Sequence, residues 1–407
     1  MRFQAPTGTR DLLPGDALWW RLVSEIERVL PLYGYGRIQT PALEDTAMIQ
    51  RSSGAGSDIV QKETYTFDDR GGRSLTLRPE GTAPIVRAYL ENGLHREPKP
   101  VKLYTIATMY RFDRPQAGRY REHTQLSAEI IGSADPAVDA ELIQLYVELL
   151  RRFDYTSWEL QLNSIGDERC RPAYLERLTA WLDEHADALD EAARQKRATN
   201  PLRVFDVKSE RVQAALQDAP KIGESLCDEC LAHFEAVQAC LGLYGIPYTL
   251  VPTLVRGIDY YTRTTFEFKE TSTGHAQDTI CAGGRYDGLV EELGGEPTPG
   301  IGFGAGLDRL VLALADSGAS AEVRKLDAFI VTEDKEPLLP LLAELRHRGV
   351  AVDLDYMGRS RNAQVKHAQR LDPRRIVLVE GDTATIRERG RDDESVGLGE
   401  LVARLTK

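Results

Sequence analysis

The first strong pattern along the chain is a run of apolar residues at helical spacing that begins after Asp16. Its members are Leu18, Trp19, Leu22, Val23, Ile26, Val29 and Leu30. This spacing predicts an amphipathic helix, because residues three and four apart lie on one helix face. A Gly-containing turn at residues 33–36 breaks the pattern, and a short strand is expected to end at Pro41, which cannot donate a ladder hydrogen bond. The helix and strand form a candidate dimer interface.

A second pattern change occurs around Pro79. Residues 51–73 are polar and contain glycine, so they are predicted to be mobile, whereas residues 74–78 alternate as a strand. Thr82 then opens a predicted helix over residues 83–92. Glu80 has two interpretations at this helix start: it caps backbone N–H groups, or it receives the ammonium group of a substrate.

Two predicted strands between residues 103 and 131 flank a loop that contains Pro115 and Gly118. The arginines on or beside this loop are Arg111, Arg114, Arg119 and Arg121. They form either a solvated basic hairpin or a site for anions, since guanidinium groups suit phosphates. The second strand has polar residues at every other position, namely His123, Gln125, Ser127 and Glu129. Because alternate residues share one face of a strand, this face is predicted to be a site rather than a core.

The composition changes twice after this point. An amphipathic helix and a strand at residues 158–164 are followed by an Ala-, Glu-, Arg- and Leu-rich stretch with helical periodicity, interrupted at Asn200-Pro201. We interpret residues 168–245 as an inserted helical module. After a linker at residues 317–325, the pattern predicts β-α-β-α-β elements over residues 328–379, hence a separate domain. Its local basic cluster, which is either a nucleic-acid surface or a solvated helix face, is Arg359, Arg361, Lys366, Arg370, Arg374 and Arg375.

Residues 254–268 concentrate a cation, a carboxylate, two phenols and an alternating strand. They form either an edge strand with a surface arginine or a polar pocket lined by Arg256, Tyr260 and Tyr261. Glycines at residues 283–288 and 300–306 permit close approach of the backbone to a ligand. Arg309, on the first turn of the helix that follows, can stack on a nucleobase or reach a phosphate. A P-loop is excluded, because its Gly-Lys-Ser/Thr ending is missing.

Composition narrows the class of protein. A chain of 407 residues with 42% hydrophobic content is expected to form two or three soluble domains. It contains neither an apolar run long enough for a bilayer nor a secretory signal, so a cytoplasmic location is expected. The net charge of -12 argues against nonspecific coating of nucleic acid, although a local basic face suffices for a specific complex.

The cysteines are expected to be reduced, because there are five of them in a long chain. Cys227 and Cys230, with His233 nearby, suggest a zinc site, but a structural site needs four ligands and only Cys240 lies close in sequence. We therefore predict reduced cysteines on helix faces and no metal ligands.

Five segments, taken together and in this order, resemble the histidyl-tRNA synthetases, a family of class II aminoacyl-tRNA synthetases. They are residues 78–82, 110–115, 256–261, 283–288 and 302–310. The resemblance implies an α+β fold, with the class II antiparallel sheet and flanking helices, a helical insertion and a C-terminal α/β anticodon-binding domain. The boundaries expected are 1–167 and 246–320 for the two parts of the catalytic domain, 168–245 for the insertion and 326–407 for the anticodon-binding domain.

The resemblance also implies a reaction. Such an enzyme is a ligase of protein biosynthesis that joins L-histidine to tRNA(His) through a histidyl-adenylate, consumes ATP and releases AMP and diphosphate. Mg²⁺ would bridge the ATP phosphates, the insertion would approach the tRNA acceptor stem, and the chain would act as a homodimer. No catalytic nucleophile is needed, in agreement with the lack of a convincing Ser/His/Asp or Cys/His arrangement.

Site residues follow from the same resemblance. Arg111 and Arg256 would be catalytic and hold the α-phosphate from two sides. The histidine-binding residues would be Glu80, Gly81, Thr82, Gln125, Glu129, Tyr260, Tyr261 and Tyr286. The ATP-binding residues would be Arg111, Asp113, Arg119, His123 and Arg309. Asp113 replaces the usual glutamate, and His123 a common phenylalanine; the first shortens the reach toward adenine, and the second can stack on it and titrate.

Two other classes compete with this one. A histidine-sensing regulatory subunit of ATP phosphoribosyltransferase is a non-catalytic paralogue that typically lacks the second histidine-specific motif and the C-terminal domain, and this chain has both. A pseudo-synthetase that binds RNA or regulates a kinase would be expected to lose Arg111 or Arg256, and neither is lost.

Overall fold

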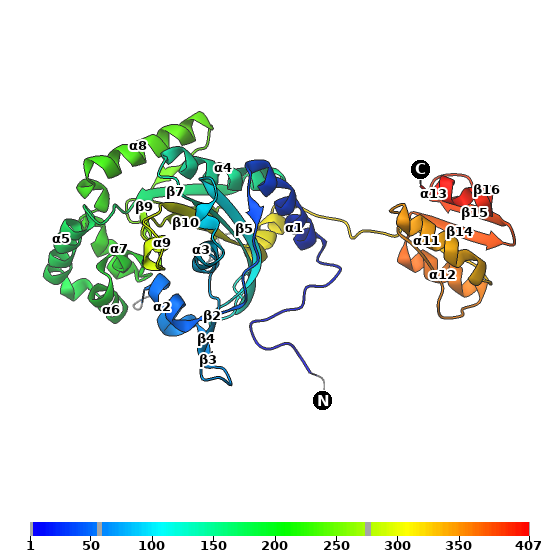
Figure 1. Cartoon of the computed structure of the whole chain (residues 1–407), viewed down its shortest axis with the longest axis horizontal. Coiled ribbons are helices and arrows are strands. Elements are labelled where there is room, and N and C mark those ends of the chain that lie inside the picture. The colour runs from blue at the N-terminus through cyan, green and yellow to red at the C-terminus, as the bar shows by residue number, and fades with distance from the viewer. Residues whose placement is uncertain (1–2, 55–58, 273–277, 407) are drawn as a thin grey trace. The chain divides into compact units, whose positions relative to one another are not determined.

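The computed structural model describes residues 3–54, 59–272 and 278–406. The chain divides into two compact units, Met1–Ala321 and Glu322–Lys407, and each is described by itself (Figure 1). Among the described residues, no helix combines the length and apolar character needed to cross a membrane.

The first unit is built on a mixed sheet whose described strands lie in the order β1-β5-β6-β11-β10-β9-β7-β8. Neighbours are antiparallel except for the pairs β1–β5 and β7–β8 at the two edges. The sheet thereby interleaves strands from both halves of the unit, and the predicted α+β class is confirmed. The strands are β1 Gly36–Arg37, β5 Val101–Tyr110, β6 Glu122–Ile131, β7 Trp158–Ser164, β8 Thr249–Leu250, β9 Thr262–Glu270, β10 Thr279–Arg285 and β11 Gly300–Gly306.

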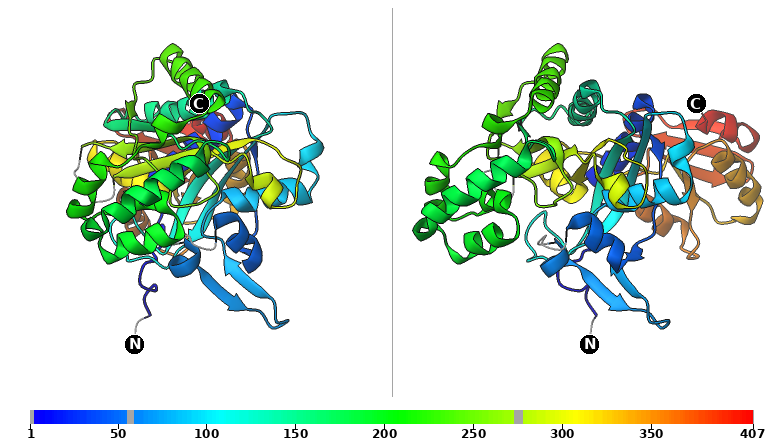
Figure 2. Two further views of the ribbon diagram at one scale, coloured as in Figure 1. Left: turned by 90° about the vertical axis from the view of Figure 1, so that its left-hand side faces the viewer. Right: turned by 60° about the vertical axis from the view of Figure 1, so that its left-hand side comes forward.

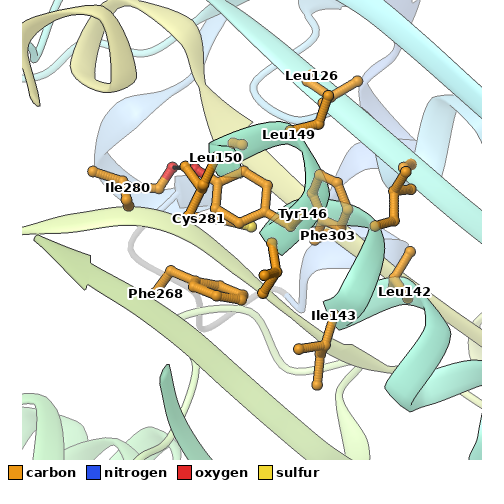
Figure 3. Packing of buried hydrophobic residues seen from close by; sticks show 14 of the residues in the cluster. Leu126, Leu142, Ile143, Tyr146, Leu149, Leu150, Phe268, Ile280, Cys281 and Phe303 are labelled. Atoms are coloured by element: carbon orange, nitrogen blue, oxygen red, sulfur yellow. Dashed lines mark hydrogen bonds between the residues drawn. The ribbon is translucent and has the colours of Figure 1, made fainter. Parts of the chain in front are cut away.

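One face of this sheet is covered by helices that enclose the main hydrophobic core. Tyr146 of α4 lies between the rings of Phe268 and Phe303, with ring centroids 4.8 and 5.5 Å away (Figure 3). Such tilted and edge-to-face aromatic contacts add to the free energy gained by burying the rings themselves. The helices of this layer are α1 Ala17–Val29, α4 Pro136–Arg151, α8 Asp228–Leu243 and α10 Leu307–Asp316. The helix predicted after Asp16 is confirmed as α1.

The alternation of side chains along the central strands determines which residues lie on the face of the sheet opposite the main core. On β6, Leu126, Ala128 and Ile130 belong to the core, so Gln125, Ser127 and Glu129 point the opposite way, as predicted. On β11, Ile301, Phe303 and Ala305 belong to the core in the same manner. The glycines between them lie on the opposite face, which is therefore polar and has few protruding side chains.

Further helices pack on or beside that second face around a separate hydrophobic cluster. They are α3 Thr82–Glu91, α5 Arg171–Glu184, α6 Glu191–Thr199, α7 Glu210–Ala215 and α9 Leu289–Glu292. The segment predicted as an insertion is helical (green in Figure 2), with a 3₁₀ stretch from Pro201. Its last helix, α8, packs into the main core through Phe234, Val237 and Leu241. Only the part before α8 is thus free of the main core.

A small sheet in the order β2-β4-β3 projects from the first unit (Figures 1 and 2). It contains β2 Leu43–Asp45, β3 Tyr65–Asp68 and β4 Ser74–Leu77, and α2 Thr46–Ser53 lies beside it. The segment at residues 51–73, which was predicted to be mobile, contains the end of α2, a π-helical turn Ile59–Glu63 and the strand β3, and β3 was not predicted from the sequence. Residues 55–58 of that segment lie outside the described part.

The second unit has the predicted β-α-β-α-β start: β12 Ala328–Val331, α11 Leu339–His347, β13 Val352–Leu354, α12 Arg361–Leu371 and β14 Arg375–Glu380. An antiparallel extension that was not predicted completes its sheet, in the order β13-β12-β14-β15-β16. The added elements are β15 Thr383–Glu388, β16 Glu394–Gly397 and α13 Leu401–Leu405.

Much of the predicted basic cluster in this unit is neutralised locally. The ion pairs are Arg359–Asp355, Arg361–Glu380, Arg374–Asp327 and Arg375–Glu388. A nucleic acid would have to compete with these carboxylates for the guanidinium groups.

Candidate active site

A cavity of about 300 Å³ lies on the polar face of the large sheet. Most residues predicted for the site line it: Glu80, Thr82, Arg111, Asp113, Arg119, His123, Gln125, Arg256, Tyr260, Tyr261 and Arg309. Lining residues that were not predicted include Tyr120, Ile258, Glu267, Thr279, Gly304, Gly306 and Asp308. Gly81, Glu129 and Tyr286 were predicted to contact histidine, but they are buried and are not among the residues that line this cavity.

We call Glu80, Thr82, Glu129 and Tyr286 the buried floor. Glu80 accepts the N–H groups of Thr82 and Ala83 at 2.7 and 2.8 Å, so it caps α3 as one interpretation predicted. The Thr82 hydroxyl donates to Glu129 Oε1 (2.8 Å), and the Tyr286 hydroxyl donates to Glu129 Oε2 (2.7 Å). Glu129 is fully buried, and burial raises its pKa well above the ordinary value.

Glycines make room for this floor. A Cβ on Gly302, which pairs with Glu129 across the sheet, would stand 1.7 Å from Glu129 Oε2. A Cβ on Gly304 would stand 2.7 Å from Gln125 Nε2, and one on Gly81 would stand 2.2 Å from Ser127 Oγ. The side chains of Gln125 and Glu129 on β6 therefore lie across the backbone of β11, where only glycine fits.

We call Arg111, Arg119, Arg256 and Arg309 the arginine rim. Arg111 follows β5, and its Nε donates to the Pro79 carbonyl at 2.7 Å. Arg256 precedes β9 and forms an ion pair with Glu267. Burial opposes the charge of Arg256, yet Glu267 and neighbouring groups raise its pKa. Arg309 donates to the Thr279 carbonyl, and burial followed by the charges of Arg119 and Arg111 lowers its pKa.

Two rim contacts add to what the resemblance implied. Asp113 and Arg119, both predicted to bind ATP, form an ion pair with each other. Glu267, which pairs with Arg256, was not predicted as a site residue at all. The signal was present, because Glu267 alternates with the core residues Phe266 and Phe268 on β9 and so must face the cavity.

His123 was predicted to titrate, and its surroundings oppose this. Burial, then the charges of Arg111 and Arg309, lower its pKa to about 3. The imidazole is therefore neutral at physiological pH. Its Nδ1 is buried without a hydrogen-bond partner among the described residues.

Mg²⁺ prefers carboxylate and phosphate oxygens as ligands, so the carboxylates of the cavity are the protein groups that could hold it. Glu80 caps α3, Asp113 pairs with Arg119, Glu267 with Arg256, and Asp308 with Arg10 at 2.5 Å. Every described carboxylate that lines the cavity is thus already engaged. The residues do not fit a protein-held magnesium site, and any Mg²⁺ would enter with the phosphates of a nucleotide.

Comparison with known proteins identifies the family. The model of the histidyl-tRNA synthetase family matches residues 8–310. A histidine--tRNA ligase of Desulforudis audaxviator is 47% identical over 100% of this chain and 99% of that protein, and one of Halothermothrix orenii is 44% identical over 94% and 92%. The apo histidyl-tRNA synthetase of S. aureus matches all of both chains with a TM-score of 0.84 and 34% identity. The chain therefore belongs to the histidyl-tRNA synthetase family.

Proposed function

We propose that this chain ligates L-histidine to tRNA(His) in two steps: ATP and histidine form histidyl-adenylate and diphosphate, and the 3′-terminal ribose of the tRNA then takes the histidyl group and releases AMP. The observation that carries the proposal is the convergence of Arg111 and Arg256 on one cavity. Arg111 directly follows β5, and Arg256 lies in the segment before β9; these two strands are separated in the sheet by β6, β11 and β10. Two guanidinium groups that reach the cavity from such separate parts of the sheet can bind an α-phosphate from both sides.

Charge development explains the need for both arginines. In the first step the carboxylate of histidine attacks the α-phosphorus, and negative charge builds up on the phosphoryl oxygens as diphosphate leaves. Fixed guanidinium groups stabilise that charge without reorganisation at the moment of reaction. Arg256 is held in place by Glu267, and Arg111 by the Pro79 carbonyl, so neither must be ordered by the substrate.

The other end of the cavity suits a histidine. Glu80, Gln125, Tyr260 and Tyr261 offer a carboxylate, an amide and two phenols to an ammonium group and an imidazole. The Tyr260 hydroxyl lies 3.4 Å from Glu80 Oε2, which places acceptors for an ammonium group side by side. Glu129 and Tyr286 contribute indirectly, since they hold Thr82 in position.

Other parts of the proposal rest on family membership. The second unit would bind the anticodon, the helical segment at residues 168–245 would approach the acceptor stem, and the enzyme would act as a cytoplasmic homodimer with Mg²⁺ bound to the ATP phosphates. His123 and Arg309 would flank the adenine, and Arg119 would contact the phosphates once it exchanges Asp113 for them.

The test is histidine-dependent ATP–diphosphate exchange together with charging of tRNA(His). Arg256→Ala is expected to lower the exchange rate by about 10²- to 10³-fold, the usual cost of one donor to a developing anion. Arg151→Ala removes an exposed arginine remote from the cavity and is the matched control, with unchanged rates. An Arg256→Ala enzyme that is folded and as fast as the wild type would refute the role of this arginine, whereas a wild-type chain without any exchange would refute the proposed function.

The competing class is a histidine sensor that regulates ATP phosphoribosyltransferase. Such a protein would bind histidine without catalysing exchange. The complete rim and the second unit both favour the ligase. Histidine binding without exchange or charging would favour the sensor.

A further inference from the structure

Two short segments far apart in sequence bring four metal-ligating side chains together outside the cavity. Asp167 and Cys170 lie at the junction of β7 and α5, and Cys227 and Cys230 lie at the start of α8. Their ligand atoms, one carboxylate oxygen and three Sγ atoms, all lie within 4.8 Å of one another. Each pair has the x₂ spacing that zinc sites use, so the second pair that the sequence lacked is supplied by an aspartate and a cysteine.

The separations suit a tetrahedral ion. Cys170 Sγ lies 3.9 Å from Cys230 Sγ and 3.6 Å from Asp167 Oδ1. Ideal tetrahedral zinc with Zn–S and Zn–O bonds of about 2.3 and 2.0 Å places two sulfurs about 3.8 Å apart and a sulfur and an oxygen about 3.5 Å apart. All three cysteines are free, and the 3.9 Å separation is far longer than a disulfide bond.

The two carboxylate oxygens of Asp167 have different partners. Oδ1 faces Cys170 and accepts the Arg169 N–H at 3.0 Å. Oδ2 accepts from the guanidinium groups of Arg169 and Arg263 at 3.2 and 3.3 Å. These outer contacts fix the orientation of Oδ1 and offset the negative charge of three thiolates and a carboxylate, as partners of metal ligands do.

We propose that Asp167, Cys170, Cys227 and Cys230 bind one Zn²⁺ ion in a closed tetrahedral site. The predominance of thiolates selects zinc over Mg²⁺ or Ca²⁺, and four protein ligands leave no open position for catalysis. Binding is ligand exchange without oxidation: each thiol that coordinates the ion loses its proton to solvent. His233 and Cys240, the ligands the sequence suggested, lie outside the cluster, and His233 instead contacts Asp139 at 3.0 Å.

The proposed ion would fasten both ends of the helical segment to the strand beside the cavity. Cys170 precedes α5 and Cys227 precedes α8, so the ion closes the loop formed by α5, α6 and α7. Arg263 links Asp167 to β9, and its backbone exchanges hydrogen bonds with Ile165 and Gly166 at 2.8 and 2.7 Å. Arg171 also donates to the carbonyl of the cavity residue Tyr261 at 2.7 Å. The site is therefore structural, and it anchors the segment next to the cavity.

The test is metal uptake by the full-length chain, purified under reducing conditions and stripped with a chelator. Titration with Co²⁺ is followed through thiolate-to-cobalt charge-transfer absorption, and Zn²⁺ is then added as competitor. We expect saturation at one equivalent per chain, displacement by Zn²⁺, and a higher midpoint of thermal unfolding for the zinc form. Cys227→Ser and Cys230→Ser should abolish stoichiometric uptake. Cys240→Ser, which removes a cysteine of α8 outside the cluster, should leave it unchanged.

Asp167→Cys keeps the proposal testable if the serine variants fail to fold. It converts the set to four thiolates, so it should retain one equivalent of Co²⁺ with stronger charge-transfer absorption. The proposal is overturned if the wild type takes up no saturable Co²⁺ or Zn²⁺, if Cys240→Ser loses uptake as the serine variants do, or if Cys170 and Cys230 form a disulfide under the same reducing conditions.

Discussion

The buried floor and the arginine rim belong to one cavity, yet they are built on opposite principles. In the floor, both oxygens of Glu129 accept hydrogen bonds from neutral hydroxyls, and Glu80 accepts two backbone N–H groups. In the rim, Arg119 and Arg256 are held by the carboxylates of Asp113 and Glu267. The polar groups of the floor have their hydrogen-bond partners within the protein, whereas the rim contains ion pairs in which an anionic ligand can take the place of the carboxylate.

This difference indicates a division of tasks. A satisfied buried network is costly to disturb, because the loss of one partner leaves a polar group without solvent or a hydrogen bond. Partly exposed ion pairs contribute little to stability and exchange partners at low cost. We therefore expect changes in the floor to affect folding and histidine binding, and changes in the rim to affect the chemistry of the phosphate.

The largest effect on stability is expected from Gly302→Ala. The new Cβ would overlap Glu129 Oε2, a fully buried atom, so the carboxylate must leave both of its hydroxyl donors. We expect a loss of about 3 kcal/mol in the free energy of unfolding, the upper range for overpacking, measured by chemical denaturation. Gly306→Ala on the same strand, where a Cβ meets nothing within 4 Å, should be as stable as the wild type.

A smaller effect is expected when one bond of the floor is removed. Thr82→Val keeps the shape of the side chain but leaves Glu129 Oε1 without its donor, which should cost about 1–2 kcal/mol and raise the KM for histidine more than the KM for ATP. Thr82→Ser retains the hydroxyl and should recover most of both losses. Equal behaviour of the two variants would contradict the importance of this hydrogen bond.

The next effect concerns His123 and emerges only in acid. The unfolded chain binds a proton on this imidazole below its usual pKa of 6.5, whereas the folded chain does so only near 3. Stability contributed by the neutral imidazole is therefore lost as the pH falls from about 6.5 toward 3. When the pH falls from 7.5 to 5.5, the free energy of unfolding of the wild type should decrease by about 1 kcal/mol through this group. His123→Phe should not show this decrease. Parallel pH–stability curves for the two proteins would contradict this.

The smallest effect is expected from Asp113→Asn in the rim. Removal of a partly exposed ion pair should change stability by about 0.5 kcal/mol or less, and Arg119 becomes free to contact phosphates. We expect the KM for ATP to change while the KM for histidine does not. Asp69→Asn breaks a comparable pair with Arg73 on the exposed β3–β4 hairpin and should change neither KM. A change in the KM for histidine in Asp113→Asn would contradict the division between floor and rim.

Much of the molecule followed from local patterns. The spacing after Asp16 predicted α1, the alternation from His123 to Glu129 predicted the polar face of β6, and the position of Glu80 before Thr82 made helix capping one of its two interpretations. These features depend on neighbours within one or two turns of chain, so a single sequence contains them. The short strand β3 was missed, since its alternation covers only 4 residues and so short a run is weak evidence for a strand.

For residues within strands and helices, the sequence by itself determined which face of the element each side chain occupies, because the period of a strand or a helix assigns each residue to a face. Only the tertiary structure decided which of those side chains touch. Tyr286 supports Glu129, which lies 157 residues away in the chain, and Arg10 pairs with Asp308, which lies 298 residues away. The same holds for Asp167 and Cys170, which meet Cys227 and Cys230 only after the helical segment has folded back. Periodicity fixes the direction in which a side chain points from its strand or helix. Contacts between distant residues depend on sheet order and register, which no local pattern encodes.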